Sequence, residues 1–168
     1  MAYATAPPVF RSILCPVDFS ANSRAALRYA AMLARLADAH LLVLYVEDPL
    51  LAAARATRRS AAVLVMADEQ ELRRFVTNAL RGATPPVATT FTTAAGNPAR
   101  EIVNAAERHH CDLIVLGYRG AGRAARLLFG STTEGVVRAS AVPVIAIPPS
   151  RRRERRSRTN RIRLERVS

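Results

Sequence analysis

Short apolar runs alternate with longer segments of helical periodicity along most of this chain. The run "ILCPV" ends at Val17, and residues 22–39 then repeat apolar and alanine positions every three or four residues. Three more apolar runs follow: "HLLVLYV" from His40, "CDLIVLG" to Gly117 and "VPVIAIP" to Pro148. Strands that are apolar without interruption are typical of parallel sheets covered by helices on both faces. The pattern predicts an α/β fold built on an open, all-parallel, Rossmann-like sheet.

The segments between these runs supply the remaining elements. We expect a helix over 61–81, a strand within the Thr- and Val-rich segment 85–96, a helix that starts at Asn97-Pro98, and a short helix over 131–139. Residues 49–60 have no clean period and are expected to be irregular or partly helical. The predicted order is five strands that alternate with four helices.

The length of 168 residues suits one domain with its own core. Half of the residues are apolar but only 5% are aromatic, so Ala, Val, Leu and Ile must form that core. The predicted domain covers residues 10–148. We expect residues 1–9 to be a flexible N-terminus and residues 149–168 to be an arginine-rich, disordered tail.

The net charge of +12 is concentrated at one end of the chain. Residues 151–168 hold nine arginines against Glu154 and Glu165, which gives 9 − 2 = +7 and leaves 12 − 7 = +5 for the other residues. Two interpretations of this tail stay open: a solubilising end, or a segment that binds nucleic acid or an acidic protein. All 25 basic residues are arginine, so a phosphate loop of the GxxxxGK[ST] type is excluded.

No apolar stretch has the length of about 20 residues that a membrane span needs, and the N-terminus lacks the pattern of a secretory signal. We therefore expect a cytoplasmic protein. Cys15 and Cys111 have no CxxC spacing, and their strands place them too far apart for a disulfide. Both are expected to be small buried apolar side chains.

The segment "GYRGAGRAARLLFGS", residues 117–131, follows a predicted buried strand and has three interpretations. Residues 120–125 fit the dinucleotide pattern GxGxx[GA], but they follow the fourth strand instead of the first, and the next strand ends without an acid for ribose. A second interpretation is that the glycines only turn the chain and the arginines are solvated. Arg123 and Arg126 in particular are expected to lie on a solvated face.

The third interpretation uses a wider spacing. Gly117, Gly120 and Gly130-Ser131 form the pattern GxxGx₉G[ST], and its last two residues open the predicted short helix. Glycines allow the backbone to approach a ligand closely, and consecutive amides form an anion-binding nest. A helix N-terminus adds further N–H groups and the positive end of its dipole. This pattern predicts a triphosphate site that needs no lysine.

These motifs together resemble the universal stress protein family. The resemblance rests on "ILCPVDFS", "LLVLYV", "GNPAREIVNAAERHHCDLIVLG", the complete glycine pattern and "VPVIAIP", and it spans residues 10–148. It implies a sheet of order 3-2-1-4-5, ATP as the cofactor, with or without Mg²⁺, and a homodimer formed through the last strand, residues 142–147. A regulatory or stress-response role that depends on the nucleotide follows from the same resemblance.

The resemblance also implies a set of nucleotide-binding residues. The adenosine moiety would contact Pro16, Val17, Asp18 and the backbone of Val46. The phosphates would lie along Gly117, Arg119, Gly120, Gly130, Ser131 and Thr132. Thr132 departs from the valine that is frequent at its position, which matters little if the contact is through a backbone N–H.

A binding module is favoured over an efficient enzyme, and slow ATP turnover stays open. Hydrolysis calls for a positioned general base and carboxylates for a metal, but the only acid in the loop and its helix is Glu134. His40, His109 and His110 lie where helices run into strands, at the opposite edge of the sheet from the predicted site. Asp18 has a second interpretation, because it could help to cap the helix that begins after Ser20.

Overall fold

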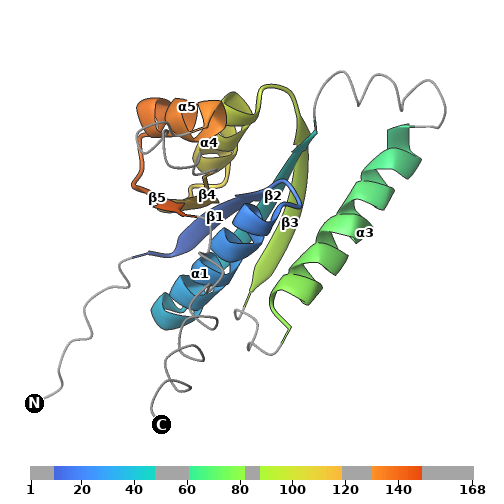
Figure 1. Ribbon diagram of the computed structural model, residues 1–168, viewed down its shortest axis with the longest axis horizontal. Helices are drawn as coiled ribbons and strands as arrows, with labels where there is room; N and C mark the ends of the chain where they lie inside the picture. Colours follow the sequence, from blue (N-terminus) through green and yellow to red (C-terminus); the bar gives the residue numbers. More distant parts are fainter. Residues whose placement is uncertain (1–9, 48–60, 82–87, 119–129, 149–168) are drawn as a thin grey trace, which may run out of the picture.

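The computed structural model describes residues 10–47, 61–81, 88–118 and 130–148, and these form one sheet of five parallel strands. The strands are β1 (Ser12–Val17), β2 (His40–Glu47), β3 (Thr89–Ala95), β4 (Leu113–Gly117) and β5 (Val144–Ile147). Their order across the sheet is β3-β2-β1-β4-β5, as Figure 1 shows. The predicted fold class and strand order are therefore confirmed.

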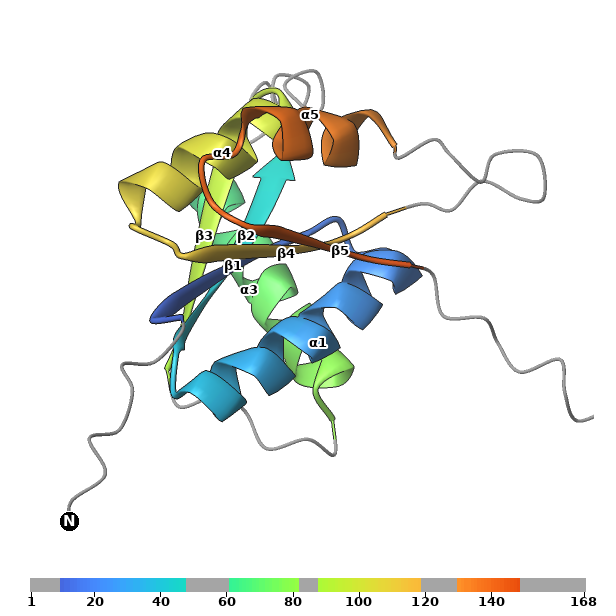
Figure 2. The same cartoon turned by 90° about the vertical axis from the view of Figure 1, so that its left-hand side faces the viewer.

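Four described helices cover the two faces of the sheet. They are α1 (Ala21–Ala37), α3 (Ala61–Ala79), α4 (Pro98–Arg108) and α5 (Ser131–Ala139). Seen along the sheet in Figure 2, α1 and α3 lie on one side and α4 and α5 on the other. The alternation of side chains along β1 divides it between two cores: Ile13 and Cys15 join the cluster under α1 and α3, and Leu14 joins the cluster under α4 and α5.

The predicted helix starts are set by side-chain caps. Ser20 accepts a hydrogen bond from the Ser23 N–H at its Oγ (3.2 Å) and begins α1, and Asn97 accepts one from the Arg100 N–H at its Oδ1 (3.1 Å) and begins α4. The end of α1 was predicted at Ala39. It lies at Ala37, because Asp38 adopts a left-handed conformation (φ 50°) that stops the helix.

The last strand is shorter than its apolar run. The run begins at Val142, but β5 begins at Val144. Ser140 explains the difference, because its Oγ both donates to the Val142 carbonyl (2.8 Å) and accepts from the Val142 N–H (3.1 Å). This local turn occupies the Val142 backbone before the strand can form.

Five of the predicted segments have different bounds in the structure or lie outside the described residues. The helix predicted over 61–81 ends at Ala79, and the strand predicted within 85–96 is Thr89–Ala95. Residues 1–9, 49–60 and 149–168 lie outside the described part of the chain, so the flexible N-terminus and the disordered tail stay predictions. Across the four described ranges, no helix is long and apolar enough to cross a membrane.

Both cysteines are free and buried. Cys15 belongs to the core under α1 and α3, and Cys111 belongs to the core under α4 and α5. Burial raises the pKa of both thiols, and a hydrogen bond from the Ser12 Oγ to the Cys111 Sγ (3.5 Å) opposes this effect only at Cys111. The two thiols are inert core groups, as the sequence predicted.

Candidate functional site

A cavity of about 500 Å³ opens at the carboxyl ends of β1, β2 and β4, on the side of the sheet that α4 and α5 cover. Strand ends and the first turns of helices supply its walls. Its lining residues are Pro16, Val17, Asp18, Ser23, Val46, Pro98, Ile102, Leu116, Gly117, Gly130, Ser131, Thr132 and Thr133. The size is that of a small-molecule site, for which volumes of about 300–1,000 Å³ are usual.

The cavity brings together residues that the sequence analysis had singled out separately. Eight of the ten predicted nucleotide-binding residues line it: Pro16, Val17, Asp18, Val46, Gly117, Gly130, Ser131 and Thr132. The other two, Arg119 and Gly120, lie outside the described residues. Segments more than 100 residues apart in the sequence thus meet at one rim, because parallel strands end at the same edge of a sheet.

Five lining residues were not predicted: Ser23, Pro98, Ile102, Leu116 and Thr133. Ser23 and Thr133 are the two buried polar residues of the described chain, and each lies in the first turn of a helix that follows a strand. Pro98 opens α4 in the same way. The available signal was topological, because every helix that follows a parallel strand begins at the carboxyl rim.

The loop from β1 to α1 is held by its own hydrogen bonds. The Ser20 N–H donates to the Asp18 Oδ1 (3.1 Å), the Asp18 N–H donates to the Ser23 Oγ (3.3 Å), and the Ser23 Oγ donates to the Ser20 carbonyl (3.1 Å). Asp18 therefore supports the turn that carries the Ser20 cap, and it lines the cavity at the same time. The capping interpretation and the cavity position are compatible.

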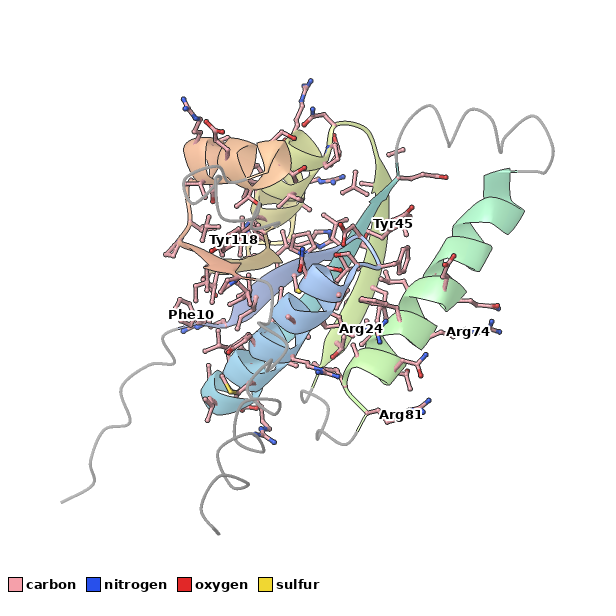
Figure 3. All side chains as sticks on the ribbon, in the orientation of Figure 1. Phe10, Arg24, Tyr45, Arg74, Arg81 and Tyr118 are labelled. Carbon is pink, nitrogen blue, oxygen red and sulfur yellow. The ribbon has the colours of Figure 1, made fainter. Side chains whose placement is uncertain are left out.

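Phe19 fixes the direction of this loop. Its backbone is left-handed (φ 60°), which is strained for a bulky residue. The ring packs against Tyr45 (4.8 Å between centroids) and, edge to face, against Phe75 (5.4 Å). Figure 3 shows Tyr45 and Arg24 on the side of the sheet that faces α3. Because Phe19 is anchored there, its neighbour Asp18 is directed to the cavity rim.

Gly117 is required by the fold itself. A Cβ at this position would lie 2.6 Å from the backbone carbon and oxygen of Asn22 and 3.0 Å from the Ser23 nitrogen. The end of β4 thus passes directly against the first turn of α1, and no side chain fits between them.

Gly130 is not required by the fold. A Cβ there would meet nothing within 4 Å, and its backbone (φ −56°, ψ 152°) is open to any residue. The space in front of Gly130 is the cavity. A glycine at this position leaves room for a bound molecule beside the start of α5.

The helices that begin at this cavity differ in their caps. Ser20 closes the N-terminus of α1 and Asn97 that of α4, whereas α5 begins at Gly130 without a side-chain cap. The first intrahelical bond of α5 is the one from the Glu134 N–H to the Gly130 carbonyl (3.0 Å). The N–H groups of Ser131, Thr132 and Thr133, in the first turn, have no partner within the helix and lie at the positive end of its dipole.

Charged side chains are scarce around the cavity. Among its described lining residues Asp18 is the only charged one. Glu134 lies just behind the wall and pairs with Arg138 one turn further along α5 (2.7 Å), so it is an exposed surface acid. Among the described residues no group of three or more His, Cys, Asp and Glu side chains could hold a metal ion.

The three histidines lie at the opposite rim, as predicted. His40 begins β2 and contacts the Thr90 Oγ1 through its Nε2 (2.8 Å), while His109 and His110 follow the end of α4. Arg123, Arg126 and the arginine-rich tail lie outside the described residues. The solvated face expected for these two arginines and the nucleic-acid interpretation of the tail therefore stay predictions.

The fold and the cavity define a class of protein: an open α/β sheet with a cavity at the point where the strand order reverses, between β1 and β4, which is the position at which such sheets bind ligands. Comparison with known proteins then narrows this class. The chain belongs to the universal stress protein family, whose model matches residues 10–148.

Two relatives bear the family name. A universal stress protein of Mycolicibacterium smegmatis is 30% identical over 141 residues, which cover 80% of this chain and 47% of that protein. Universal stress protein MJ0531 of Methanocaldococcus jannaschii is 30% identical over 142 residues, which cover 83% of this chain and 82% of that protein. The chain thus spans about half of the first relative and most of the second.

Solved structures share the fold. Hypothetical protein MJ0577 has a TM-score of 0.65 with 25% identity, and the match covers 83% of this chain and 96% of that one. A universal stress protein in complex with cAMP has a TM-score of 0.61 and 22% identity, and the match covers 84% of this chain and 98% of that one. A universal stress protein from Archaeoglobus fulgidus in complex with dAMP has a TM-score of 0.56 and 22% identity, and the match covers 83% of this chain and 98% of that one.

Proposed function

We propose that this protein binds ATP in the cavity at the carboxyl rim and acts as a nucleotide-dependent regulatory or stress-response module. The observation that carries the proposal is the start of α5 at the cavity: Gly130 provides no side-chain cap there, and Gly130, Ser131 and Thr132 line the cavity. Such a helix start favours phosphate. Two proteins of the same fold were solved with cAMP and with dAMP, which supports an adenine nucleotide as the ligand.

The proposed orientation follows from the two sides of the cavity. Pro16, Val17, Asp18 and Val46 offer apolar surface and one carboxylate, which suits the adenosine moiety. Across the cavity, Gly117 and the start of α5, Gly130, Ser131 and Thr132, offer close backbone approach and amide donors, which suits the phosphates. Arg119 and Gly120 would complete the phosphate side. A Mg²⁺ ion would enter with the ATP that it accompanies.

The chemistry of the lining favours binding over efficient hydrolysis. Its one described carboxylate, Asp18, belongs to the proposed adenosine side and is engaged with the Ser20 N–H. No described histidine lines the cavity. A general base aimed at the phosphate end is thus absent from the described lining, which leaves slow turnover at most.

Equilibrium dialysis with labelled ATP tests the proposal. The folded wild-type protein should bind one ATP per chain, and Gly130→Val should lower the affinity at least tenfold, because the valine side chain enters the space in front of the α5 amides. Gly130→Ala is the matched control with a smaller intrusion and an intermediate affinity. Both variants should unfold at the wild-type urea concentration. Absence of ATP binding by the folded wild type would end the proposal.

We also propose that two copies associate through β5. Among the described strands, β5 lies at one edge of the sheet and pairs only with β4, and its Ile145 is 36% exposed. Helix α1, which packs beside β5, exposes Tyr29, Met32 and Leu36. An apolar strand edge of this kind invites pairing with a second chain. Sedimentation should show a dimer for the wild type and a monomer for Ile145→Arg; an Ile145→Arg dimer would refute this interface.

A further inference from the structure

The two buried polar residues of the described chain, Ser23 and Thr133, both line the cavity. The Ser23 hydroxyl is engaged by the loop from β1 to α1, because it donates to the Ser20 carbonyl (3.1 Å) and accepts from the Asp18 N–H (3.3 Å). Among the described residues the Thr133 hydroxyl has no hydrogen-bond partner. Ser23 therefore serves the fold, and the fold does not account for the hydroxyl of Thr133.

The Thr133 oxygen faces the open space of the cavity. Every buried side-chain nitrogen and oxygen of the described residues has a hydrogen-bond partner. Thr133 is only 3% exposed and its hydroxyl has no partner, so this oxygen must be an atom through which the residue touches the cavity. Threonine inside a helix commonly bonds back to the preceding turn, as the Thr77 Oγ1 does to the Arg73 carbonyl (2.9 Å). The Thr133 hydroxyl instead points to a molecule in the cavity.

Thr133 lies at the deep end of the α5 wall. Along the start of this helix Ser131 is exposed, Thr132 is half-buried and Thr133 is buried. Two other lining residues, Ile102 and Leu116, are apolar and equally buried. A ligand atom that reaches Thr133 is thus shielded from water, and a hydrogen bond to a charged acceptor is strongest in such surroundings.

The proposed orientation of the nucleotide identifies this acceptor. Its adenosine moiety lies against the ends of β1 and β2, and its phosphates lie along the start of α5. The later phosphates extend toward the exposed Ser131, so the first phosphate occupies the deepest position on this wall. We propose that the Thr133 hydroxyl donates a hydrogen bond to the phosphate group nearest the ribose, the group that AMP, ADP and ATP share. This inference rests on the proposed nucleotide site.

The test removes the hydroxyl and keeps the shape of the side chain. Thr133→Val replaces the oxygen with a methyl group, Thr133→Ser keeps the hydroxyl, and Thr77→Val makes the same change on α3, away from the cavity. Isothermal titration measures ATP, AMP and adenosine for each full-length protein. We expect Thr133→Val to lose about tenfold in affinity for both AMP and ATP, the effect of one hydrogen bond to a charged group, and little for adenosine. Thr133→Ser and Thr77→Val should retain most of the wild-type affinity.

Urea unfolding of the free proteins separates binding from folding. Thr133→Val should unfold at a urea concentration no lower than the wild type, because the hydroxyl that it removes has no partner in the fold. A clear loss of stability in this variant would assign Thr133 to the fold and overturn the proposal.

Three binding results would also overturn it: wild-type affinities for AMP and ATP in Thr133→Val, a loss for ATP alone, or an equal loss for adenosine. The first would show that the hydroxyl makes no bond to the ligand, the second would assign it to a later phosphate, and the third to the nucleoside. In all three the wild type still binds ATP. They therefore differ from failure of the proposed function, in which the wild type binds no nucleotide.

Discussion

The sheet has an amino rim, where its parallel strands begin, and a carboxyl rim, where they end. Each rim carries an aspartate, and the two carboxylates make different contacts. At the amino rim, the Asp112 Oδ2 accepts from the N–H groups of Arg11 (2.7 Å) and Ser12 (2.9 Å), so this carboxylate joins the start of β4 to the start of β1. At the carboxyl rim, Asp18 is exposed and bonds within its own turn, to the Ser20 N–H two residues away. Asp112 thus joins two distant segments, whereas the bond from the Ser20 N–H to Asp18 lies within one turn beside the cavity.

The helix ends of the two rims differ in the same sense. At the amino rim, the N–H groups after α1 and α4 return to their own helices: the Ala39 N–H donates to the Ala34 carbonyl (2.8 Å) and the Cys111 N–H to the Ala106 carbonyl (2.8 Å). At the carboxyl rim, α5 begins at Gly130, which offers its first amides no side-chain cap. Among the described contacts, the helix ends at the amino rim are closed by backbone hydrogen bonds, whereas the start of α5 at the carboxyl rim has no side-chain cap.

The largest expected effect is a difference in stability between valine variants of Gly117 and Gly130, the two glycines of the carboxyl rim. Gly117→Val should destabilise the protein by about 3 kcal/mol, because its side chain would have to displace the backbone of Asn22. Gly130→Val should change the free energy of unfolding by less than about 0.5 kcal/mol. Urea unfolding followed by circular dichroism measures both. Equal stability of the two variants would show that the close approach at Gly117 is wrong.

For the same reason Gly117→Val is a poor test of binding. A loss of ATP affinity in Gly117→Val could result from a displaced start of α1. A loss of ATP affinity in Gly130→Val would result from the side chain that occupies the cavity.

The second-largest expected effect is a difference in protein stability between alanine variants of Asp112 and Asp18. Asp112→Ala removes the acceptor of two backbone N–H groups and should cost about 2 kcal/mol. Asp18→Ala removes the exposed acceptor of the Ser20 N–H and should cost less than Asp112→Ala, about 0.5–1 kcal/mol. Thermal unfolding compares the variants. The reverse order of stabilities would contradict the division between a structural and a cavity carboxylate.

The same pair should differ in the opposite direction in nucleotide binding. Asp18→Ala should weaken adenosine and ATP binding by about tenfold, the effect of losing one charged hydrogen bond. Asp112→Ala should bind both ligands as the wild type does, because it lies at the other rim. Fluorescence titration with an adenosine analogue measures the affinities, and Asp18→Asn, which keeps an acceptor for the Ser20 N–H, separates the charge from the turn.

The smallest effect concerns Cys15, which lies in the core between the rims. Burial raises the pKa of its thiol above the ordinary value of 9.0. Above that pH the unfolded chain loses a proton that the folded chain keeps, so the free energy of unfolding should fall, by about 1 kcal/mol at pH 10. Urea unfolding at pH 8, 9 and 10 should show a smaller decrease for Cys15→Ala than for the wild type. Identical decreases would exclude Cys15 as the source.

Much of this arrangement could be predicted from local sequence. Continuous apolar runs predicted four strands, and the Thr- and Val-rich segment 85–96 predicted the fifth. Ser20 and Asn97 predicted two helix starts, and the glycine spacing pointed to Gly117 and Gly130. Such features depend on neighbouring residues only, or on the rule that parallel strands end at one edge. The family was identified from the same motifs.

The remaining features depend on contacts between distant segments. The contact of Asp112 with Arg11 and Ser12 spans about 100 residues, and no local pattern marks it. The requirement for glycine at position 117 follows from α1, which is equally remote in sequence. Helix α1 ends at Asp38 in a left-handed conformation. Glycine is the usual residue in this conformation, so an aspartate gave no sequence signal for the end of the helix.

The missing cap on α5 has a thermodynamic consequence. A glycine at the N-cap costs only a few tenths of a kcal/mol relative to Ser or Asn, so the chain gives up little by leaving this end of the helix incomplete. Any anion that binds there becomes the missing cap, and its binding energy then adds to the stability of the helix. Hydrogen exchange at the amides of Ser131, Thr132 and Thr133 would measure that effect directly, because an anion bound to these amides should slow their exchange.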